Sequence, residues 1–248
     1  FVHGAMCMSY SGKCTISNYT TGRDANKGSC AQSCRWKYTL MEENSGEYTQ
    51  VVDNIDPDFF FNTKDLCMIE YIPQIFDAGI TSLKIEGRMK TAYYVATTVR
   101  AYRMALDEYY KDPENWKFNP MWLEELKKGS HRDYSTGFFL NRPDENSNNY
   151  KSASYIRNYD FIGLVRGYDS ESGLYIVEQR NKMSVGDKIE VIGPYKETMF
   201  TTIEEMYDEE GNPIESAPHA RQIVKMKVGL ELKENYILRK PIEKTRIL

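Results

Sequence analysis

The residues best suited to chemistry are five cysteines, all within the first 67 positions of the chain: Cys7, Cys14, Cys30, Cys34 and Cys67. Cysteine thiolates are soft ligands that favour zinc or iron–sulfur clusters over calcium or magnesium. Their spacing, C-x6-C-x15-C-x3-C-x32-C, lacks the C-x2-C pair of zinc ribbons and bacterial ferredoxins. Thiols on separate loops can still meet at one cluster if the fold holds the loops together. An iron–sulfur site is therefore favoured, while a zinc site and buried structural thiols remain alternatives.

The composition places these thiols in a globular protein of a reducing compartment. The chain has 248 residues, of which 41% are hydrophobic and 27% are charged, as is typical of globular proteins. An odd number of clustered cysteines argues against the disulfide framework of a small secreted protein, so we expect a cytoplasmic location. No apolar run approaches the roughly 18 residues of a membrane-spanning helix, so we expect no membrane association.

The first 40 residues form a basic segment, although the whole chain carries a net charge of −4. A single acidic residue, Asp24, accompanies five cationic ones in this segment. The cationic residues are Lys13, Arg23, Lys27, Arg35 and Lys37. Such a patch could bind the phosphates of RNA or another anion. A solvated basic loop is an equally good interpretation.

Lys84, Glu86 and Arg88 alternate along the chain and form a second candidate site. In a strand these three side chains would lie on one face. At the carboxyl rim of an α/β barrel such a face points into the active site, so we predict that they line a substrate site. The alternative is a structural ladder of ion pairs.

His131 and Arg132 lie in a loop bounded by Gly129 and Gly137. They offer a titratable ring and a planar guanidinium that can pair with a carboxylate or phosphate. We predict that they complete the substrate site. The alternative is a loop that packs against the mouth of a barrel.

Hydrophobic periodicity predicts the elements that would position these groups. We expect a helix over 65–78, a strand over 80–86, a long helix over 91–110 with Val95 on its apolar face, and a short helix over 121–128. Helix, strand and helix in series are typical of a βα unit. The polar, turn-rich stretch at 141–149 is interpreted as a linker.

Beyond the linker the pattern changes to short β-rich segments separated by turn signals. The segments lie at 160–168, 173–180, 187–193, 197–204, 221–228 and 235–240. Spacing of this kind predicts a small antiparallel β-barrel. The expected fold class is therefore α/β followed by β, with one domain over 1–145 and a second over 150–248.

Two stretches near the start resemble the signature of peptidase family U-32, which reads E-x-F-x2-G-[SA]-[LIVM]-C-x4-G-x-C-x-[LIVM]-S. The residues FVHGAMC at 1–7 and GKCTIS at 12–17 agree with it at every position from Phe1 onward, and the leading glutamate would precede Phe1. Five further stretches resemble the same family, at 22–24, 30–36, 65–67, 83–90 and 130–138. The likeness covers residues 1–140, with a weaker signal at 185–187.

The resemblance implies a fold and a choice of functions. It implies a TIM-like α/β barrel of which this chain would hold the C-terminal portion, with the first half supplied by a missing segment or a partner. Members of the family are named collagenase-like peptidases, but several bacterial members are iron–sulfur proteins of RNA or quinone hydroxylation. The tRNA members act on the wobble uridine. A protein of RNA hydroxylation is therefore expected, with tRNA as partner, and a peptidase or a non-catalytic piece as alternatives.

The resemblance also implies roles for single residues. The ligands of a 4Fe–4S cluster would be Cys7, Cys14, Cys30 and Cys67, with Cys34 able to replace one of them. Residues Lys84, Glu86, Arg88, His131 and Arg132 would line the substrate site. The peptidase alternative has less support from the residues, because the H-E-x-x-H motif of zinc proteases is absent and only three histidines are present.

Overall fold

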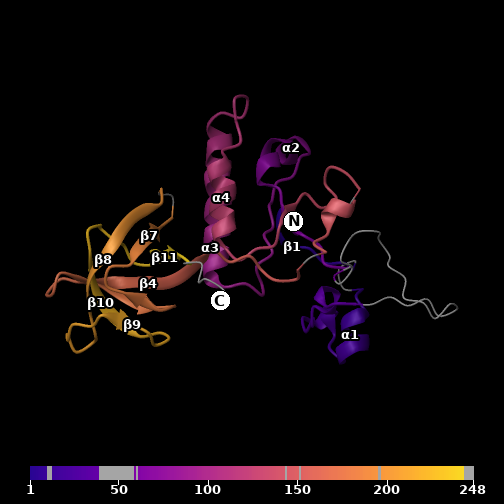
Figure 1. Ribbon diagram of the computed structural model, residues 1–248. Coiled ribbons are helices and arrows are strands. Elements are labelled where there is room, and N and C mark those ends of the chain that lie inside the picture. Colours follow the sequence, from indigo (N-terminus) through magenta and orange to yellow (C-terminus); the bar gives the residue numbers. More distant parts are fainter. Residues whose placement is uncertain are drawn as a thin grey trace. The chain divides into compact units, whose positions relative to one another are not determined.

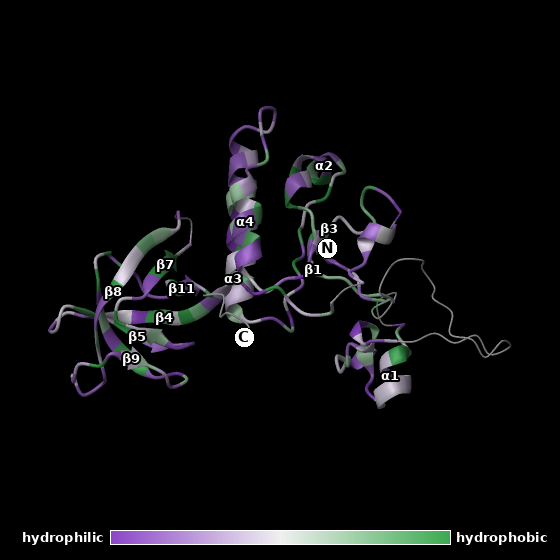
Figure 2. Ribbon diagram, in the orientation of Figure 1, coloured by the Kyte–Doolittle hydropathy of each residue, from purple (hydrophilic) through white to green (hydrophobic). Residues whose placement is uncertain are grey.

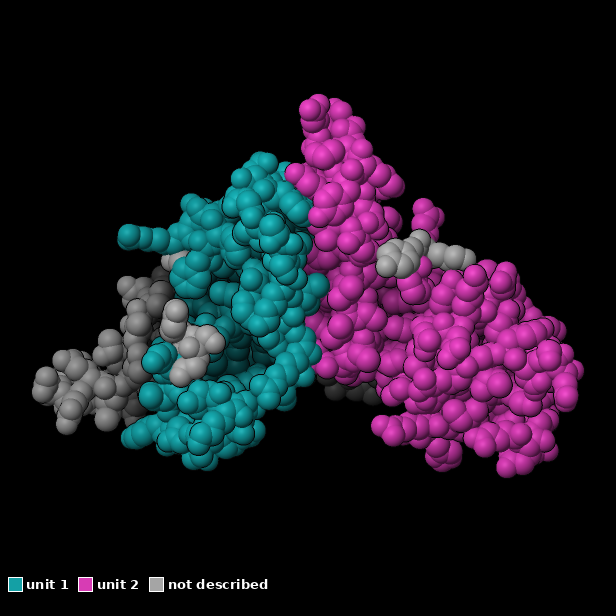
Figure 3. All heavy atoms as spheres, turned by 180° about the vertical axis from the view of Figure 1, so that it is seen from behind, with its two compact units in different colours: residues 1–89, 131–156 teal, residues 90–130, 157–248 magenta. Residues whose placement is uncertain are grey.

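The computed structural model describes residues 1–9, 13–38, 59, 61–142, 144–150, 152–194 and 197–242. The chain divides into two compact units, which are coloured separately in Figure 3. Unit 1 comprises residues 1–89 and 131–156, and unit 2 comprises residues 90–130 and 157–248. The sequence interpretation instead placed everything up to residue 145 in one domain. The difference lies in the two helices between residues 92 and 128, which group with the C-terminal part of the chain.

Unit 1 contains a three-stranded sheet of short strands. The order is β1-β2-β3, with bounds β1 (His3–Ala5), β2 (Asp65–Cys67) and β3 (Tyr134–Ser135). β1 runs antiparallel to β2, whereas β2 and β3 are parallel. Within the described residues, this three-stranded sheet alone does not confirm the predicted portion of a TIM-like barrel.

The helices of unit 1 are short. Among the described residues they are α1 (Ile16–Thr21), the 3-10 turns η1 (Ala25–Lys27), η2 (Ser33–Arg35), η4 (Ile69–Tyr71) and η5 (Glu145–Ser147), and α2 (Ile72–Asp77). The helix expected over 65–78 is therefore wrong in its first turn, because Asp65–Cys67 pair with both neighbouring strands as β2. Pro73 lies in the first turn of α2, where a missing N–H costs nothing.

The segment expected as a strand over 80–86 is mostly irregular. Only Ile85 forms a bridge, parallel to His3. The Val2 N–H donates to the Lys84 carbonyl at 2.9 Å, and the Glu86 N–H donates to the His3 carbonyl at 2.8 Å. The segment thus lies along β1 without continuing as a strand.

Two helices open unit 2, as Figure 1 shows. They are α3 (Ala92–Lys111) and α4 (Pro120–Lys128), which confirms both predicted helices. The Thr91 side chain accepts from the Tyr94 N–H and caps α3, and Asn119 caps α4 in the same way. The predicted apolar face is buried only in part, since Tyr102 is buried but Val95 is 39% exposed, whereas Tyr94 and Ala101 beside it are buried. No helix in the described part of the chain is long and apolar enough to span a membrane.

The rest of unit 2 is a closed antiparallel barrel of six strands. The strand order is β10-β5-β4-β11-β7-β8. The bounds are β4 (Tyr159–Asp169), β5 (Leu174–Gln179), β7 (Lys188–Ile192), β8 (Met199–Tyr207), β10 (Ile223–Val228) and β11 (Ile237–Pro241). A small two-stranded sheet pairs β6 (Met183–Ser184) with β9 (Ser216–Ala217). All six predicted β segments are confirmed.

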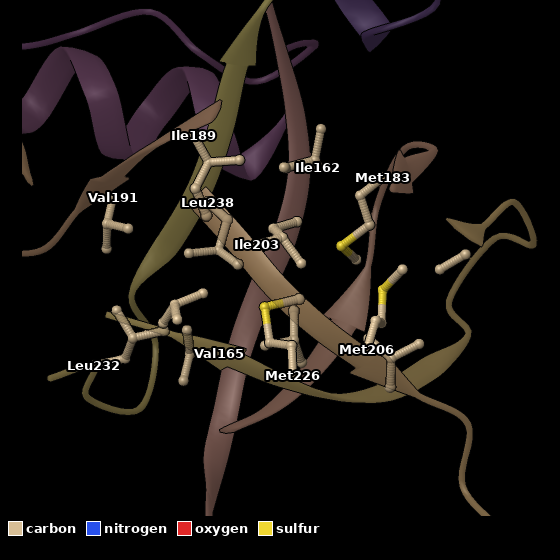
Figure 4. Close-up of a cluster of buried hydrophobic side chains, with 14 of the residues drawn as sticks. Ile162, Val165, Met183, Ile189, Val191, Ile203, Met206, Met226, Leu232 and Leu238 are labelled. Atoms are coloured by element: carbon tan, nitrogen blue, oxygen red, sulfur yellow. The ribbon is translucent and has the colours of Figure 1, made fainter. Parts of the chain in front are cut away.

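The barrel closes around a hydrophobic core, which Figure 4 shows. Ile162, Val165, Ile203, Met226 and Leu238 are fully buried there. Figure 2 shows both hydrophobic and hydrophilic residues along β4. Burial alternates regularly along β10, as expected when one face of a strand points inward. The barrel was predicted from the short β-rich segments and the turn signals between them.

A buried ion-pair network joins α3 and α4 to the barrel within unit 2. Arg239 of β11 donates to both oxygens of Glu125 of α4, at 2.7 and 2.9 Å, and to Glu190 of β7 at 2.8 Å. Arg100 of α3 pairs with Glu125 at 3.0 Å. The network gives a physical reason why the two helices group with the barrel. No local sequence pattern predicted it.

Candidate functional site

A cavity of about 500 Å³ opens in unit 1, and four of the five cysteines line it: Cys7, Cys14, Cys30 and Cys34. We call it the cysteine cavity. Its wall comes from β1, the loop after it, α1, the turns η1 and η2, and the loop after β3. Segments that are far apart in the sequence thus bring four thiols to one place.

Backbone N–H groups point at two of the sulfurs. The Gln32 N–H donates to Cys30 Sγ at 3.2 Å. A hydrogen bond from the Ser17 backbone lowers the pKa of Cys14. Hydrogen bonds of this kind stabilise thiolates, the form of cysteine that binds metals.

Cys34 lies in a different environment from Cys14. Burial raises the pKa of Cys34, and the neighbouring Cys7, Cys30 and Cys14 sulfurs raise it further. These contributions agree with the position of Cys34 beside the other three thiols in the wall of the cavity. Several thiolates at one cavity would repel one another, which costs free energy unless a bound cation or cluster neutralises their charge.

Four thiols at one cavity are a soft donor set, of the kind that zinc and iron–sulfur clusters both use. Within the described ranges no group of three or more histidine, cysteine, aspartate or glutamate side chains is placed to hold one ion. A single zinc ion needs its thiolates at about 2.3 Å from one centre. In a 4Fe–4S cluster each thiolate binds a different iron atom, so the four sulfurs surround a larger centre. The thiol-lined cavity therefore fits a cluster by its donor set.

Cys67 takes a different position from the other predicted ligands. It is buried at the end of β2, where it pairs with His3 of β1. His3 lines the cysteine cavity, but Cys67 is not among the lining residues, whereas Cys34 is. The choice between Cys34 and Cys67 as fourth ligand stays a prediction.

Close packing around Gly4 fixes one wall of the cavity. Gly4 has φ of +123°, and a Cβ there would lie 2.6 Å from the Glu86 carbonyl oxygen. Only glycine allows both this backbone conformation and this approach. Glu86 consequently lies against β1 and lines the cavity, with its carboxylate accepting from the Arg88 N–H at 2.9 Å.

The three alternating charges of residues 84–88 do not form one substrate-facing row. Lys84 Nζ lies 4.4 Å from the ring centroid of Phe1, and Arg88 packs against Gly28 of the loop before Cys30. Glu86 is the member of the three that lines the cavity. Lys84 and Arg88 are exposed, so both remain available at its outer edge.

Arg35 is buried, which contradicts its predicted role in phosphate binding. Its guanidinium donates to Asn62 Oδ1 at 2.6 Å, to the Thr63 carbonyl at 2.5 Å and to the Met6 carbonyl at 2.8 Å. Only 8% of the residue is exposed. Arg35 therefore connects the Cys34 turn to the segment before Cys7 and to the segment that leads into β2.

We expect Arg35→Met to lower the free energy of unfolding of unit 1 by about 3 kcal/mol, because it removes three hydrogen bonds of a buried guanidinium and leaves the buried Asn62 Oδ1 without this donor. Urea denaturation would measure the change. Arg23→Met is the matched control, since Arg23 is exposed and a change there is expected to stay within about 0.5 kcal/mol. Equal stability of the two variants would contradict the connecting role of Arg35.

The other four cations of the basic segment are exposed: Lys13, Arg23, Lys27 and Lys37. Lys27 pairs with Asp24 at 2.9 Å. Because both partners are solvated, this pair is weak and does not prevent a contact with phosphate. The prediction of phosphate binding is compatible with these four positions.

Arg132 is also buried, which contradicts a role in binding a substrate anion. Its guanidinium lies 3.5 Å from Asp65 and 4.0 Å from the ring centroid of Tyr155. Its backbone N–H donates to the same Asp65 carboxylate at 3.0 Å. With 2% of Arg132 exposed, this pair instead anchors the loop to β2.

His131 lies beside Arg132 in a stack of rings. It is 4% exposed and packs on Tyr134 with 5.0 Å between ring centroids, while His3 contacts the same tyrosine at 5.3 Å. Its backbone pairs with that of Ile156 in both directions. The loop therefore packs inward, which is the alternative considered from the sequence.

Comparison with known families places both parts of the chain. The family model described as "Peptidase family U32" matches residues 1–149. The model described as "Peptidase family U32 C-terminal domain" matches residues 157–239. The two matches meet close to the expected linker at 141–149.

The chain is similar to curated proteins with two kinds of name. "tRNA hydroxylation protein P1" of Bacillus subtilis is 43% identical over 97% of this chain and 57% of the relative. "tRNA hydroxylation protein P" of Escherichia coli is 30% identical over 96% of this chain and 60% of the relative. A protein named "Collagenase" from Porphyromonas gingivalis is 32% identical over 83% and 49%. The chain thus spans less than two thirds of the length of these relatives.

One solved structure is similar in sequence to the barrel part. It is described as the C-terminal domain of a "putative U32 peptidase" of Geobacillus thermoleovorans, at 44% identity. The match covers 33% of this chain and 99% of that domain, with a TM-score of 0.31.

Proposed function

Because the chain belongs to peptidase family U32 in both of its parts, we propose that it serves in tRNA hydroxylation with a 4Fe–4S cluster in the cysteine cavity. The observation that carries the proposal is the meeting of Cys7, Cys14, Cys30 and Cys34 at one cavity. The relatives named for tRNA hydroxylation match nearly the whole chain, which favours this activity over the alternative.

Cys7, Cys14 and Cys30 would supply three ligands, and Cys34 or Cys67 the fourth. A bound cluster would supply one-electron chemistry. The chain's own contribution is to hold the thiolates ready, through the N–H of Gln32 at Cys30 and the lowered pKa of Cys14. In the complete protein the sheet β1-β2-β3 would form part of a TIM-like barrel.

The exposed cations would hold the RNA backbone. Lys13 adjoins Cys14, and Lys27 adjoins the cavity residue Asn26. Phosphate contacts of this kind add affinity without reading sequence, and they weaken as salt rises. Lys84 and Arg88 would extend the same basic edge.

A peptidase remains the second candidate because of the relative named "Collagenase". His3 lines the same cavity as the cysteines, and a cysteine peptidase needs a histidine as base. The coupled set of four thiols is more than a peptidase requires, so the cluster is the better use of the site.

Two measurements on the complete protein test the proposal. Anaerobically purified protein is expected to hold about four iron and four sulfide per chain, as for one 4Fe–4S cluster. A host strain lacking the protein is expected to lose hydroxylated wobble uridine from its tRNA, as measured by mass spectrometry of digested tRNA, and to regain it with the intact gene. Unchanged tRNA, together with gelatin cleavage by iron-free protein, would favour the peptidase.

A further inference from the structure

Two phenylalanines project into water at the cysteine cavity. Phe138 is 71% exposed and Phe139 is 47% exposed, and both line the cavity. Large apolar side chains that gather at the mouth of a cavity are typical of binding surfaces. Neither phenylalanine has a role in the proposed cluster ligation or in the phosphate contacts.

A hydrogen bond and close packing fix the turn that contains Phe138 and Phe139. The Phe139 N–H donates to the Thr136 carbonyl at 3.2 Å, which closes a tight turn. Gly137 has φ of +57°, and a Cβ there would lie 3.2 Å from Met6 Cε and 3.3 Å from Leu66 Cδ1. The turn therefore packs directly on the segment that leads into Cys7, which fixes the two rings relative to the thiols.

The charges around the cavity indicate what kind of molecule fits it. No lysine or arginine is among the described residues that line the cavity. Cations lie just outside: Lys13 beside Cys14, Arg88 against Gly28, and Lys84 over Phe1, itself a lining residue. An uncharged ring inside and phosphates outside would complement this pattern.

We infer that Phe138 and Phe139 form a stacking platform for an unpaired nucleobase of RNA at the mouth of the cysteine cavity. Sequence-specific RNA proteins commonly stack unpaired bases on aromatic rings, with basic residues on the backbone. Enzymes that modify a base must remove it from its stack before reacting with it. The inference rests on the proposed function and adds the residues that receive the base.

Binding of a tRNA anticodon stem–loop with a wobble uridine tests the platform. Fluorescence anisotropy at fixed salt would give Kd for the complete protein and for Phe138→Ala and Phe139→Ala. Loss of one stacking contact is expected to raise Kd by about 5-fold to 150-fold. Phe→Trp at either position keeps a flat ring and is expected to retain binding. Phe200→Ala is the matched control, because Phe200 is 69% exposed on β8 of the barrel.

Hydroxyl-radical footprinting adds a measurement that does not depend on affinity. We expect oxidation of Phe138 and Phe139 in the protein alone, protection when the stem–loop is bound, and no change at Phe200. Iron content and visible absorption should match wild type in all variants, which shows that the cavity is intact.

The possible failures are distinguishable. Wild-type affinity in both alanine variants would overturn the platform while leaving the proposed function in place. Phenylalanines that stay unoxidised without RNA would show that another segment or protein covers them, which also overturns it. A wild-type protein that holds iron but binds no stem–loop would remove the proposed function itself.

Discussion

Serine in place of Cys7, Cys14 or Cys30 is expected to remove the visible absorption of anaerobically purified protein and most of its iron. The three sulfurs line one cavity, and the serine hydroxyl is a hard, weakly acidic group that replaces a soft thiolate poorly. Hydroxylated wobble uridine is expected to disappear with the iron. Circular dichroism should stay close to wild type, because the barrel of unit 2 has its own core.

The same experiment identifies the fourth ligand. Cys34 lines the cavity and is coupled to the other three sulfurs, whereas Cys67 is buried on β2 opposite His3. A 4Fe–4S cluster bound by cysteine takes four thiolates. We therefore expect only one of Cys34→Ser and Cys67→Ser to lose iron. Full iron content in Cys7→Ser would contradict the cluster in this cavity.

Local sequence signals were sufficient for much of the fold. The strands of the barrel are short β-rich segments separated by turn residues, and α3 and α4 begin at capping residues, Thr91 and Asn119. Both signals act over a few residues, so they can be read from the chain directly. The first turn of the helix expected over 65–78 fails for the opposite reason. Its residues pair with β1 and β3, whose paired positions lie at least 60 residues away on either side.

The candidate site was also predictable from the sequence only in part. Residue type and clustering were enough to identify the cysteines as candidate ligands. The same reasoning gave Arg35 and Arg132 roles at the surface, yet both are buried. Their partners are distant: Asn62 is 27 positions from Arg35, and Asp65 is 67 positions from Arg132. An arginine fork suits a buried carboxylate or carbonyl as well as it suits a phosphate, so residue type alone could not decide.

Arg239→Met is expected to lower the free energy of unfolding of unit 2 by about 3–5 kcal/mol, the usual cost of removing one partner from a buried ion pair. Arg239 is fully buried and bonds to Glu125 and Glu190. Burial opposes its charge, but Glu125, Tyr93 and Glu190 together outweigh this effect, so the pKa of Arg239 is raised. In the variant, the Glu125 and Glu190 carboxylates at the junction of α4 and the barrel lose the positive charge of Arg239.

Arg166→Met is the matched control, because Arg166 lies on β4 of the same barrel and pairs with Glu178 while 41% of its side chain is exposed. A solvated pair contributes at most about 1 kcal/mol. Urea denaturation at pH 7 compares the two variants, and similar losses would show that the buried network has no special weight.

Acidification gives a second expected result for the same variant. Burial raises the pKa of Glu125, but Arg239 and Lys128 together outweigh it, so the folded-state pKa is lowered overall. The contribution of Glu125 to stability is therefore complete above the ordinary glutamate pKa of about 4.3 and is lost as pH falls through the lower folded value. The difference in stability between wild type and Arg239→Met should consequently narrow below about pH 4. A difference that stays constant between pH 7 and pH 3 would mean that Arg239 stabilises unit 2 by packing, not by its charge.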